Sequence, residues 1–477
     1  MTLLKASSPK HAARWWAENK NQWLRAAIVL GTVLMSAGTA FALPERFRIV
    51  VLALPFLGAG LLILLKWPPL GLVLVIAASI LVRVSVPALG LTAALLAGLT
   101  GLWFVDMIAR QKAFSILRSP VMPPLLFFVA TSFIAFAVGQ FPWYPISPAP
   151  MDAQIGGLGI FILSCAGFFL AAHQVRDIRW LKAMTFTFLG VGSVIALAAF
   201  FPTIRRAIQP YFSRNVLGGS LFWTWLMSFA YSHAAFNRKL DKRWRIVLAV
   251  ALAGVIYIRL IDGRSWSSGW VPPLVALLVV TLIGAPRYAL PVLMLGALAV
   301  LASYEQLYAS LILVGDNEYS TMTRLEAWRI VGEIVKVNPL LGLGPSNYRF
   351  YTPLFPILGW YVQFNSHNNY VDIVAQVGLL GLACLFWFYW AIGKIGWQLR
   401  LRVPAGGFER AYVLGCIGGL AGMIVAGMLG DWVLPFVYNI GVEGMRASAM
   451  GWLFLGGLVA LEQILRRAKL ESESEIG

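Results

Sequence analysis

Apolar runs of about 20 residues recur along most of this sequence, and they constrain its fold more than any other feature. A helix of about 20 apolar residues crosses the hydrocarbon core of a bilayer and satisfies its own backbone polar groups. Hydrophobic residues make up 59% of the 477 residues and charged residues only 12%, about half the charged fraction of a soluble protein. We therefore expect an all-α polytopic membrane protein with about 14 transmembrane helices.

The apolar runs locate the expected helices and divide the chain into regions. The expected membrane spans are 24–43, 47–65, 69–87, 89–108, 121–139, 156–173, 181–201, 216–235, 246–262, 268–284, 288–312, 367–391, 411–430 and 447–465. The corresponding regions are N-terminal transmembrane helices (1–204), a core (205–392), C-terminal transmembrane helices (393–465) and a cytoplasmic tail (466–477). The polar end of this tail, "ESESEIG", predicts disorder.

One connection, 313–366, is much longer than the others. Long connections in compact folds are usually functional or disordered, and this one contains several aromatic residues, which is unlike a disordered linker. Within it, apolar residues recur near helical spacing until Asn338-Pro339 ends the pattern. These residues are Leu325, Trp328, Ile330, Val331, Ile334 and Val335. We therefore expect one large loop at the outer face that carries a short amphipathic helix over 323–337.

The net charge of +18 would suggest nucleic-acid binding in a soluble protein. Here the cations mostly flank apolar spans, so we expect membrane lipids and no nucleic acid as partners. With a cytoplasmic N-terminus, most of the 38 Lys and Arg residues, including the dense cluster at 237–245, fall on the cytoplasmic side. An even number of spans then places both termini in the cytoplasm.

The outer face has few polar groups, and His367 is the one histidine of four that falls there. Cations that the positive-inside rule disfavours share this face. They are Arg205, Arg206, Arg214, Arg264, Arg324, Arg329 and Arg349. Arginine forks at membrane depth suit a phosphate group, such as a lipid-linked pyrophosphate. The alternative is that individual arginines reach lipid headgroups, as we expect for Arg446, or solvate the loop helix, as Arg329 could.

The neighbours of His367 could assist a reaction. Ser366 could cap the following helix and leave His367 in its first turn. Asn368 and Asn369 could orient the ring or a sugar, and Asp372 could orient His367 or pair with an arginine. Nearby arginines disfavour the imidazolium and keep the ring in the neutral state that a general base needs. The alternative is a passive histidine at the membrane interface.

We expect no metal and no other cofactor. Only one histidine falls on the outer face, and the carboxylates there show no paired ligand spacing. The three cysteines all fall in apolar runs, where they are typically small core residues.

Four segments carry a resemblance to a known family. The stretch "TRLEAW…NPLLGLGPSNY", followed by "SHNNYVDIVAQVGLLGL", resembles the core of the O-antigen ligase and polymerase superfamily. "DGRSWSSG" resembles that family's Ser-Arg segment, and "YFSRNVLGGSL" resembles its Asn-containing segment. The resemblance covers about 205–390, and the earlier residues match only as a series of hydrophobic spans. Gln376 stands where the family often has a carboxylate, and Gly263 where it has Ser or Thr.

This resemblance implies a bacterial inner-membrane enzyme with a GT-C-like architecture and its active site at the periplasmic face. Its donor would be a glycan linked to undecaprenyl pyrophosphate. Its acceptor would be a lipid A core sugar for a ligase, or another glycan repeat unit for a polymerase. The family's histidine matches His367, its Ser-Arg arginine matches Arg264, and its loop arginine matches Arg324. Arg214 lies beside Asn215, on which the third motif centres.

The residues and the resemblance lead to one mechanistic hypothesis. Neutral His367 takes a proton from the acceptor hydroxyl, which attacks the anomeric carbon and inverts it. Arg264 and Arg324 hold the departing pyrophosphate. The further candidates for binding substrate are Arg214, Asn215, Arg329, Asn368, Asn369 and Asp372.

Three alternatives stay open at this point. A transporter or flippase for an anionic or lipid-linked solute would need sites near the midplane that are reachable from both sides. A non-catalytic assembly protein would not need the histidine and the arginines to converge. Within the enzyme class, ligase, polymerase and protein-directed transfer all use the same donor chemistry.

Overall fold

In the computed structural model, the described residues are 58–81, 90–112, 116–262, 267–288 and 316–476, with isolated positions at 30–31, 290–291, 293–294, 298 and 301. The chain divides into two compact units, Met1–Pro68 and Pro69–Gly477. In the first unit, Gly58–Lys66 is helical. The helices that carry the candidate site all belong to the second unit.

The second unit is helical, and the β-type pairing among its described residues is one isolated bridge between Ile357 and Trp360. Its longer helices are α3 (Pro68–Leu81), α4 (Leu91–Asp106), α5 (Met122–Val138), α6 (Met151–Gln174), α7 (Ile178–Leu197), α10 (Ser220–Phe236), α11 (Lys242–Ile256), α12 (Ser267–Gly284), α15 (Asp316–Val335), α17 (Asn369–Arg402), α18 (Phe408–Leu429) and α19 (Met445–Ile476). Its short helices are η1 (Met107–Gln111), η2 (Ala198–Phe200), α8 (Pro202–Ile208), η3 (Gln209–Tyr211), α9 (Arg214–Leu217), η4 (Tyr257–Asp262), η5 (Pro286–Tyr288), α16 (Tyr348–Tyr351), η7 (Thr352–Leu354) and η8 (Val442–Gly444).

Six helices among the described residues are long and apolar enough to cross a membrane. They are Leu91–Ala109, Met151–Gln174, Ile178–Phe200, Asn369–Arg402, Phe408–Leu429 and Val442–Ser474. The prediction of a multi-pass helical membrane protein is thus confirmed, whereas the number of fourteen spans is not. The expected spans 24–43 and 288–312 lie almost wholly outside the described residues.

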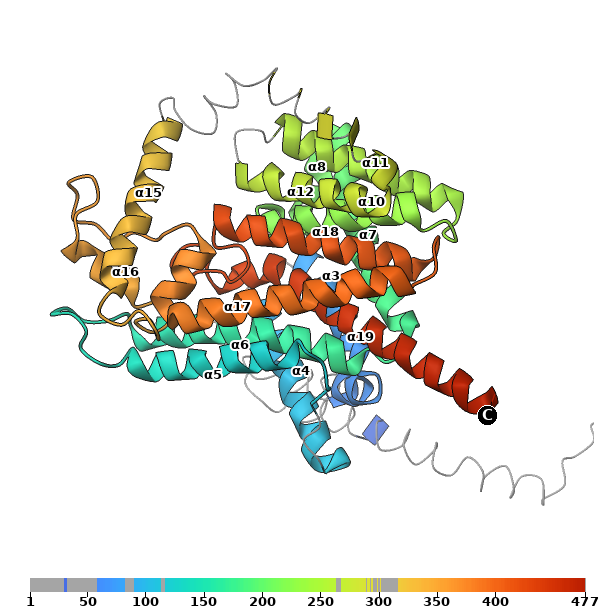
Figure 1. Cartoon of the computed structure of the whole chain (residues 1–477), viewed down its shortest axis with the longest axis horizontal. Coiled ribbons are helices and arrows are strands. Elements are labelled where there is room, and N and C mark those ends of the chain that lie inside the picture. Colours follow the sequence, from blue (N-terminus) through green and yellow to red (C-terminus); the bar gives the residue numbers. More distant parts are fainter. Residues whose placement is uncertain are drawn as a thin grey trace, which may run out of the picture. The chain divides into compact units, whose positions relative to one another are not determined.

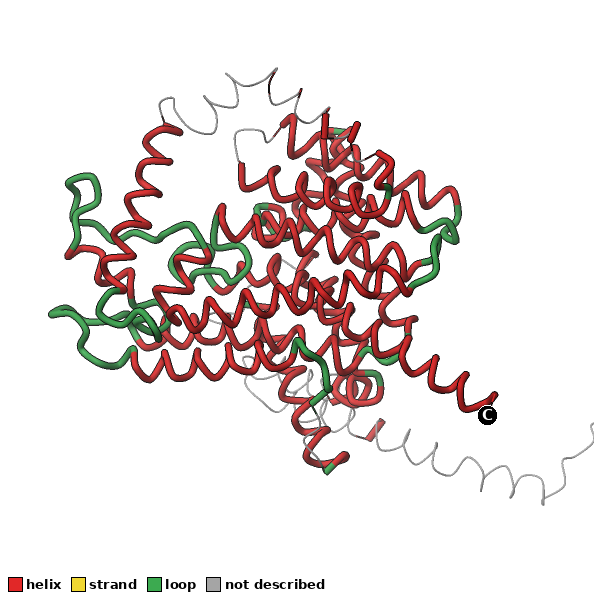
Figure 2. Tube along the Cα trace, viewed as in Figure 1, coloured by secondary structure: helices red, strands yellow, loops and turns green. Residues whose placement is uncertain are grey.

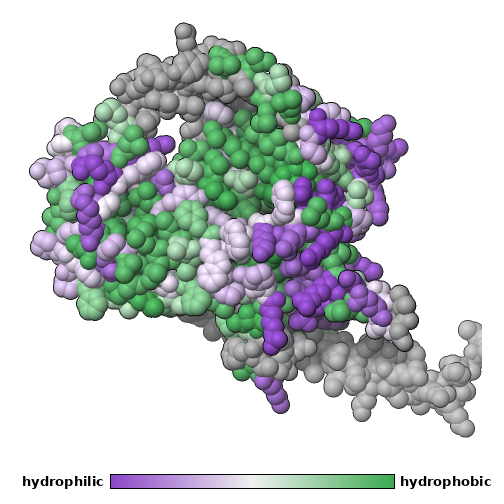
Figure 3. Space-filling view, in the orientation of Figure 1, coloured by the Kyte–Doolittle hydropathy of each residue, from purple (hydrophilic) through white to green (hydrophobic). Residues whose placement is uncertain are grey.

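The helices of the bundle run back and forth between two ends (Figures 1 and 2). The loop end carries α15, α16 and the connections 139–150, 336–368 and 430–441. The basic end carries the connections 175–177, 237–241 and 403–407. Between the two ends, the face in Figure 3 is largely hydrophobic, with hydrophilic residues gathered toward both ends. Large apolar side chains of the apolar helices are exposed, Phe127 on α5 by 57% and Trp390 on α17 by 64%, as expected of surfaces that face lipid tails.

Helix α17 is broken where the loop 338–344 packs against it. Gly378 has φ +75° inside the helix, a backbone conformation that side chains with a Cβ rarely adopt. The N–H groups of Leu343 and Gly344 donate to α17 carbonyls just before the break, and two N–H groups after it donate to loop carbonyls, at 2.9–3.2 Å. A Cβ at Gly378 would collide with the carbonyl of Leu340. The break therefore joins the predicted outer loop to the helix that follows His367.

The predicted amphipathic helix exists as α15, which is longer at its N-terminus than the predicted 323–337. Five of its residues are buried in the core of the loop end: Ala327, Ile330, Val331, Ile334 and Val335. Leu325, which was predicted on the apolar face, is 56% exposed, because the buried stripe of the helix passes through Ala327 instead.

The polar C-terminal tail was wrongly predicted to be disordered, since α19 continues through Ile476. Lys469 and Glu473 form an ion pair one turn apart, at 3.6 Å, which supports the helix locally.

Candidate functional site

His367 lies at the loop end, just before α17, in a strained conformation. Its φ is +50°, and a positive φ in a non-glycine residue often marks a functional constraint. Asn368, not Ser366, caps α17, because its side chain accepts from the N–H groups of Tyr370 and Val371. His367 therefore precedes the helix and does not lie in its first turn, which corrects the prediction.

Two arginines of the predicted outer loop lie close enough to act electrostatically on His367. Burial lowers the pKa of His367, and the charges of Arg324 on α15 and Arg349 on α16 lower it further. Burial also lowers the pKa of Arg324 itself. The ring is half-buried, and the two cations favour its neutral form.

Asp372 does not orient His367 and does not pair with an arginine, in contrast to both predictions. Its Oδ1 accepts hydrogen bonds from the Tyr348 hydroxyl at 2.5 Å and from the Ser366 hydroxyl at 2.7 Å. The carboxylate is 1% exposed. Asp372 therefore holds Ser366, the residue before His367, and links it to Tyr348.

A second polar chain reaches His367 from the connection between α18 and η8. The side-chain amide nitrogen of Asn439 lies 3.3 Å from Nδ1 of His367 and 2.6 Å from Oδ1 of Asp431. Asp431 is 1% exposed, and its Oδ2 accepts the N–H of Phe436 at 2.9 Å. Burial raises the pKa of Asp431. This series of hydrogen bonds makes Asn439 the partner of His367 at Nδ1.

Further hydrogen bonds hold the segment around His367 in place. The indole of Trp328 on α15 donates to the carbonyl of Ser366 at 2.7 Å. Asn369 is buried, and its side chain bonds the backbone of Val433 and Leu434. The side chains of Asn368 and Asn369 thus bond the backbone. The prediction that they orient the imidazole is not supported by these bonds.

Gln376, on α17, connects two backbone segments near His367. Its Oε1 accepts the N–H of Ser346 at 2.9 Å, and its Nε2 donates to the carbonyl of Asp372 at 3.2 Å. The amide thereby links the outer loop to α17 without reaching His367.

A cavity of about 270 Å³ is lined by residues of α7, α8, η3, α9, α10 and η4. Arg205, Arg214 and Arg259 line it, together with Gln209. Arg259 is 8% exposed, and its guanidinium lies 4.8 Å from the ring centre of Trp223. A cavity with three guanidinium groups is suited to a group with several negative charges.

The structure does not bring all predicted site residues together. Arg264 lies outside the described residues. Arg329 is exposed on α15 and forms a two-pronged ion pair with Glu326, at 2.7 and 3.0 Å. Asn215 is exposed beside Arg214 in α9. Helix α9 packs against η8, and η8 begins three residues after Asn439. Arg446 was predicted to reach lipid headgroups. It is instead buried and paired with Glu443.

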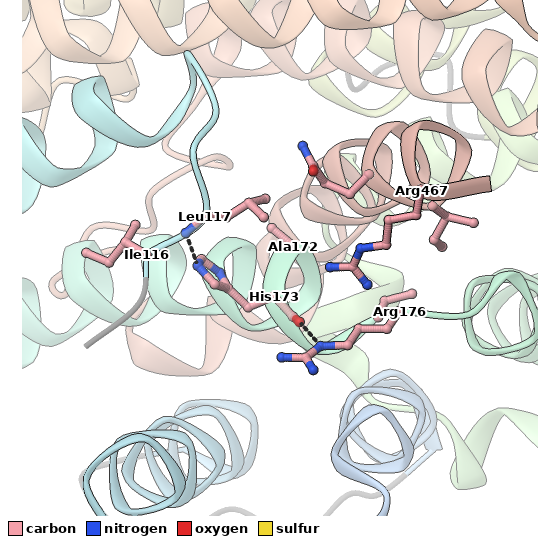
Figure 4. Close-up of a pocket in the computed structure, with 9 residues that line it drawn as sticks. Ile116, Leu117, Ala172, His173, Arg176 and Arg467 are labelled. Carbon is pink, nitrogen blue, oxygen red and sulfur yellow. Dashed lines mark hydrogen bonds between the residues drawn. The ribbon is translucent and has the colours of Figure 1, made fainter. Parts of the chain in front are cut away.

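Among the described residues, no group of three His, Cys, Asp or Glu side chains is placed to hold a metal ion. A second cavity, of about 200 Å³, lies near the basic end, between the ends of α6 and α19. Arg176 and Arg467 lie on two sides of it, and His173 bonds the N–H of Leu117 (Figure 4). This cavity is separate from the polar chains around His367.

Sequence reasoning missed Arg259, Asn439 and the role of Asp431. Arg259 had a usable signal, because a charge within the predicted span 246–262 is costly unless it has a function or a partner. Asn439 had none, since nothing in the sequence places it beside a residue 72 positions away.

The fold and the site define a polytopic helical membrane protein with arginines and a neutral histidine gathered at one end. Residues 245–386 match the O-antigen ligase family, which confirms the resemblance seen in the sequence. The match supports a membrane glycan transferase of the O-antigen ligase and polymerase type, which uses a lipid-linked glycan donor and an acceptor sugar. A search among curated proteins finds no match to the chain.

Proposed function

We propose that this protein moves a glycan from undecaprenyl pyrophosphate to an acceptor sugar at the periplasmic face of the inner membrane. The observation that carries the proposal is His367, a strained histidine at the loop end whose pKa is lowered by burial and by the charges of Arg324 and Arg349. A neutral imidazole beside cations suits a base that works next to an anionic leaving group. The family match over 245–386 includes His367 and Arg324.

In the proposed step, His367 takes the proton of the acceptor hydroxyl as that oxygen bonds the anomeric carbon. The bond between this carbon and the pyrophosphate oxygen breaks, and its electron pair leaves with the pyrophosphate. One displacement inverts the anomeric centre. Arg324 stabilises the charge on the leaving group, together with Arg264. The step uses no metal.

The cavity lined by Arg214 is the second place for the donor's phosphates in this proposal. Its volume and its three guanidinium groups fit a pyrophosphate. Asn215 lies in the same short helix and could bond the first sugar. Arg329 has no part in this proposal, because Glu326 already neutralises it on the outer surface of α15.

The proposed orientation puts the loop end in the periplasm and both termini in the cytoplasm. The basic end carries the cluster at 238–245 and the cations that flank the connections 175–177 and 403–407, which the positive-inside rule places in the cytoplasm. Of the aromatic residues of the outer loop, Trp360 is 67% exposed, whereas Tyr348 and Tyr351 are buried. Trp360 is therefore a surface available to stack on a sugar, as is the neighbouring Tyr361, which is 69% exposed.

The test is glycan transfer by the purified protein in detergent. Undecaprenyl-pyrophosphate glycan is supplied with either a lipid A core or a second repeat unit, in the presence of a chelator. We expect transfer by the wild type and a loss of about 10²–10⁴-fold in H367A. The acceptor that is used distinguishes ligase from polymerase. Equal transfer by both proteins would remove His367 as the base, and loss of transfer in chelator alone would contradict the metal-free step.

A further inference from the structure

The side-chain amide of Asn439 lies between two titratable groups, and this geometry links them. One amide nitrogen faces both Nδ1 of His367, at 3.3 Å, and Oδ1 of Asp431, at 2.6 Å. In this orientation its two hydrogens donate to both neighbours. Nδ1 then accepts, so a neutral ring carries its proton on Nε2 and cannot take a proton there.

The opposite orientation of the same amide reverses every role. The amide oxygen then faces both neighbours and accepts the Nδ1–H of His367, which leaves Nε2 free as a base. The same oxygen also faces Oδ1 of Asp431 at hydrogen-bond distance. Two oxygens are compatible there only if Asp431 carries a proton and donates it.

We propose that Asp431 and Asn439 are positioning residues that decide which nitrogen of His367 carries the proton, and hence whether His367 can act as the base. This inference rests on the proposed function of His367. In the protonated state of Asp431, the chain from Asp431 through Asn439 to Nδ1–H holds the base-competent tautomer. Ionised Asp431 turns the amide and moves the proton of the ring to Nε2.

The surroundings of Asp431 shift its titration toward higher pH. The carboxyl is 1% exposed, and burial raises its pKa. The titratable groups that face it are Asp372 on α17 and Tyr348 on α16. The charged groups that face His367 are Arg324 on α15 and Arg349 on α16. Both arginines disfavour the imidazolium, so the choice at His367 is between the two neutral tautomers.

Asp431 also holds the turn that carries Asn439. Its Oδ2 accepts the N–H of Phe436 at 2.9 Å, and the N–H of Asn439 donates to the carbonyl of Phe436 at 3.1 Å. An asparagine at 431 can keep both bonds, because its oxygen accepts from Phe436 and its NH₂ donates to the oxygen of Asn439. D431N therefore mimics the protonated acid permanently, whereas D431L keeps neither bond.

The test reads the tautomer directly by ¹⁵N NMR of histidine-labelled protein in nanodiscs. The chain has only four histidines, and H367Q assigns the His367 signals. We expect wild type to change from the Nδ1–H to the Nε2–H form as the pH rises through the pKa of Asp431. D431N should hold the Nδ1–H form at every pH above the pKa of His367, and N439L should lose the preference. D152N, which changes an exposed carboxylate of α6, serves as the control and should behave as wild type.

Transfer kinetics give the second readout. We expect N439L and D431L to lower kcat about tenfold or more with KM nearly unchanged. D431N should keep most of the wild-type kcat. In wild type the rate should fall as Asp431 ionises at high pH, and D431N should not show this fall. A tautomer that is the same in wild type, D431N and N439L would overturn the proposal, as would a D431N that transfers no better than D431L. If the tautomer follows Asp431 while H367A still transfers, the base role fails and the linkage stands.

Discussion

At the scale of single residues, the arginine beside His367 has a testable electrostatic effect. His367 acts as a base only when it is deprotonated, so its lowered pKa keeps the base form present down to lower pH. Arg324→Leu removes one of the cations that lower this pKa, so the acid limb of kcat/KM should move to higher pH. The same change should reduce kcat about 10²–10³-fold, because a donor to the leaving group is lost.

Arg329→Leu is the matched control for the pH profile. Arg329 lies on the same helix but is paired with Glu326 in solvent, so neither the limb nor kcat should change. The measurement is kcat/KM against pH for the three proteins. An acid limb that stays in place in Arg324→Leu would contradict the electrostatic link.

A second residue-scale prediction concerns the bonds beneath His367. Tyr348 is 0% exposed, and its hydroxyl donates to Asp372 and accepts the N–H of Ser366. Tyr348→Phe leaves the N–H of Ser366 without this acceptor and removes one of the two hydrogen bonds to Oδ1 of Asp372, which should lower stability by about 1–3 kcal/mol. Thermal unfolding in detergent checks this, with the exposed Tyr361→Phe as the control that should leave Tm unchanged. Equal Tm values for the two variants would show that the buried hydroxyl contributes nothing.

The same scale shows which residues the sequence could identify. His367 and Arg324 stood out because a charged or titratable group on an apolar outer face is rare. For Arg329 the sequence left two roles open, a ligand for phosphate or a residue that solvates the loop helix, and its ion pair with Glu326 one turn away favours the second. Asn369 could not be judged, because its partners at 433 and 434 come from a distant connection.

At the scale of elements, the break in α17 gives a sharp comparison between two glycines of one helix. Gly378→Ala forces a Cβ into a left-handed conformation and against the carbonyl of Leu340, so it should cost about 2 kcal/mol or more and reduce transfer. Gly393→Ala adds a methyl at ordinary contact distance from Leu420 and should change stability by less than about 1 kcal/mol. Thermal unfolding of both variants gives the comparison, and similar Tm values would contradict it.

Helical spacing of apolar residues predicted α15, and a long apolar run predicted the membrane-spanning part of α17, because both signals are visible in the sequence itself. It could not predict the break at Gly378, since a glycine inside an apolar run also fits an unbroken helix. The break depends on hydrogen bonds from the loop 338–344, and these arise only when the chain is folded. For the same reason, the cap was placed at Ser366, although Asn368 forms it.

At the scale of the whole molecule, the orientation in the membrane decides whether the site can meet a periplasmic acceptor. Cys384 is partly exposed, whereas Cys165 and Cys416 are buried, so Cys384→Ala gives a background with little labelling. Gln363→Cys then marks the loop end and Ala405→Cys the basic end, both at exposed positions. In right-side-out vesicles, a membrane-impermeant maleimide should label position 363 at once and position 405 only after permeabilisation, because the cations at the basic end hold it in the cytoplasm. The reverse pattern would place His367 in the cytoplasm and rule out transfer to a periplasmic acceptor, and equal labelling of both positions in sealed vesicles would contradict the assignment of the two ends to opposite sides.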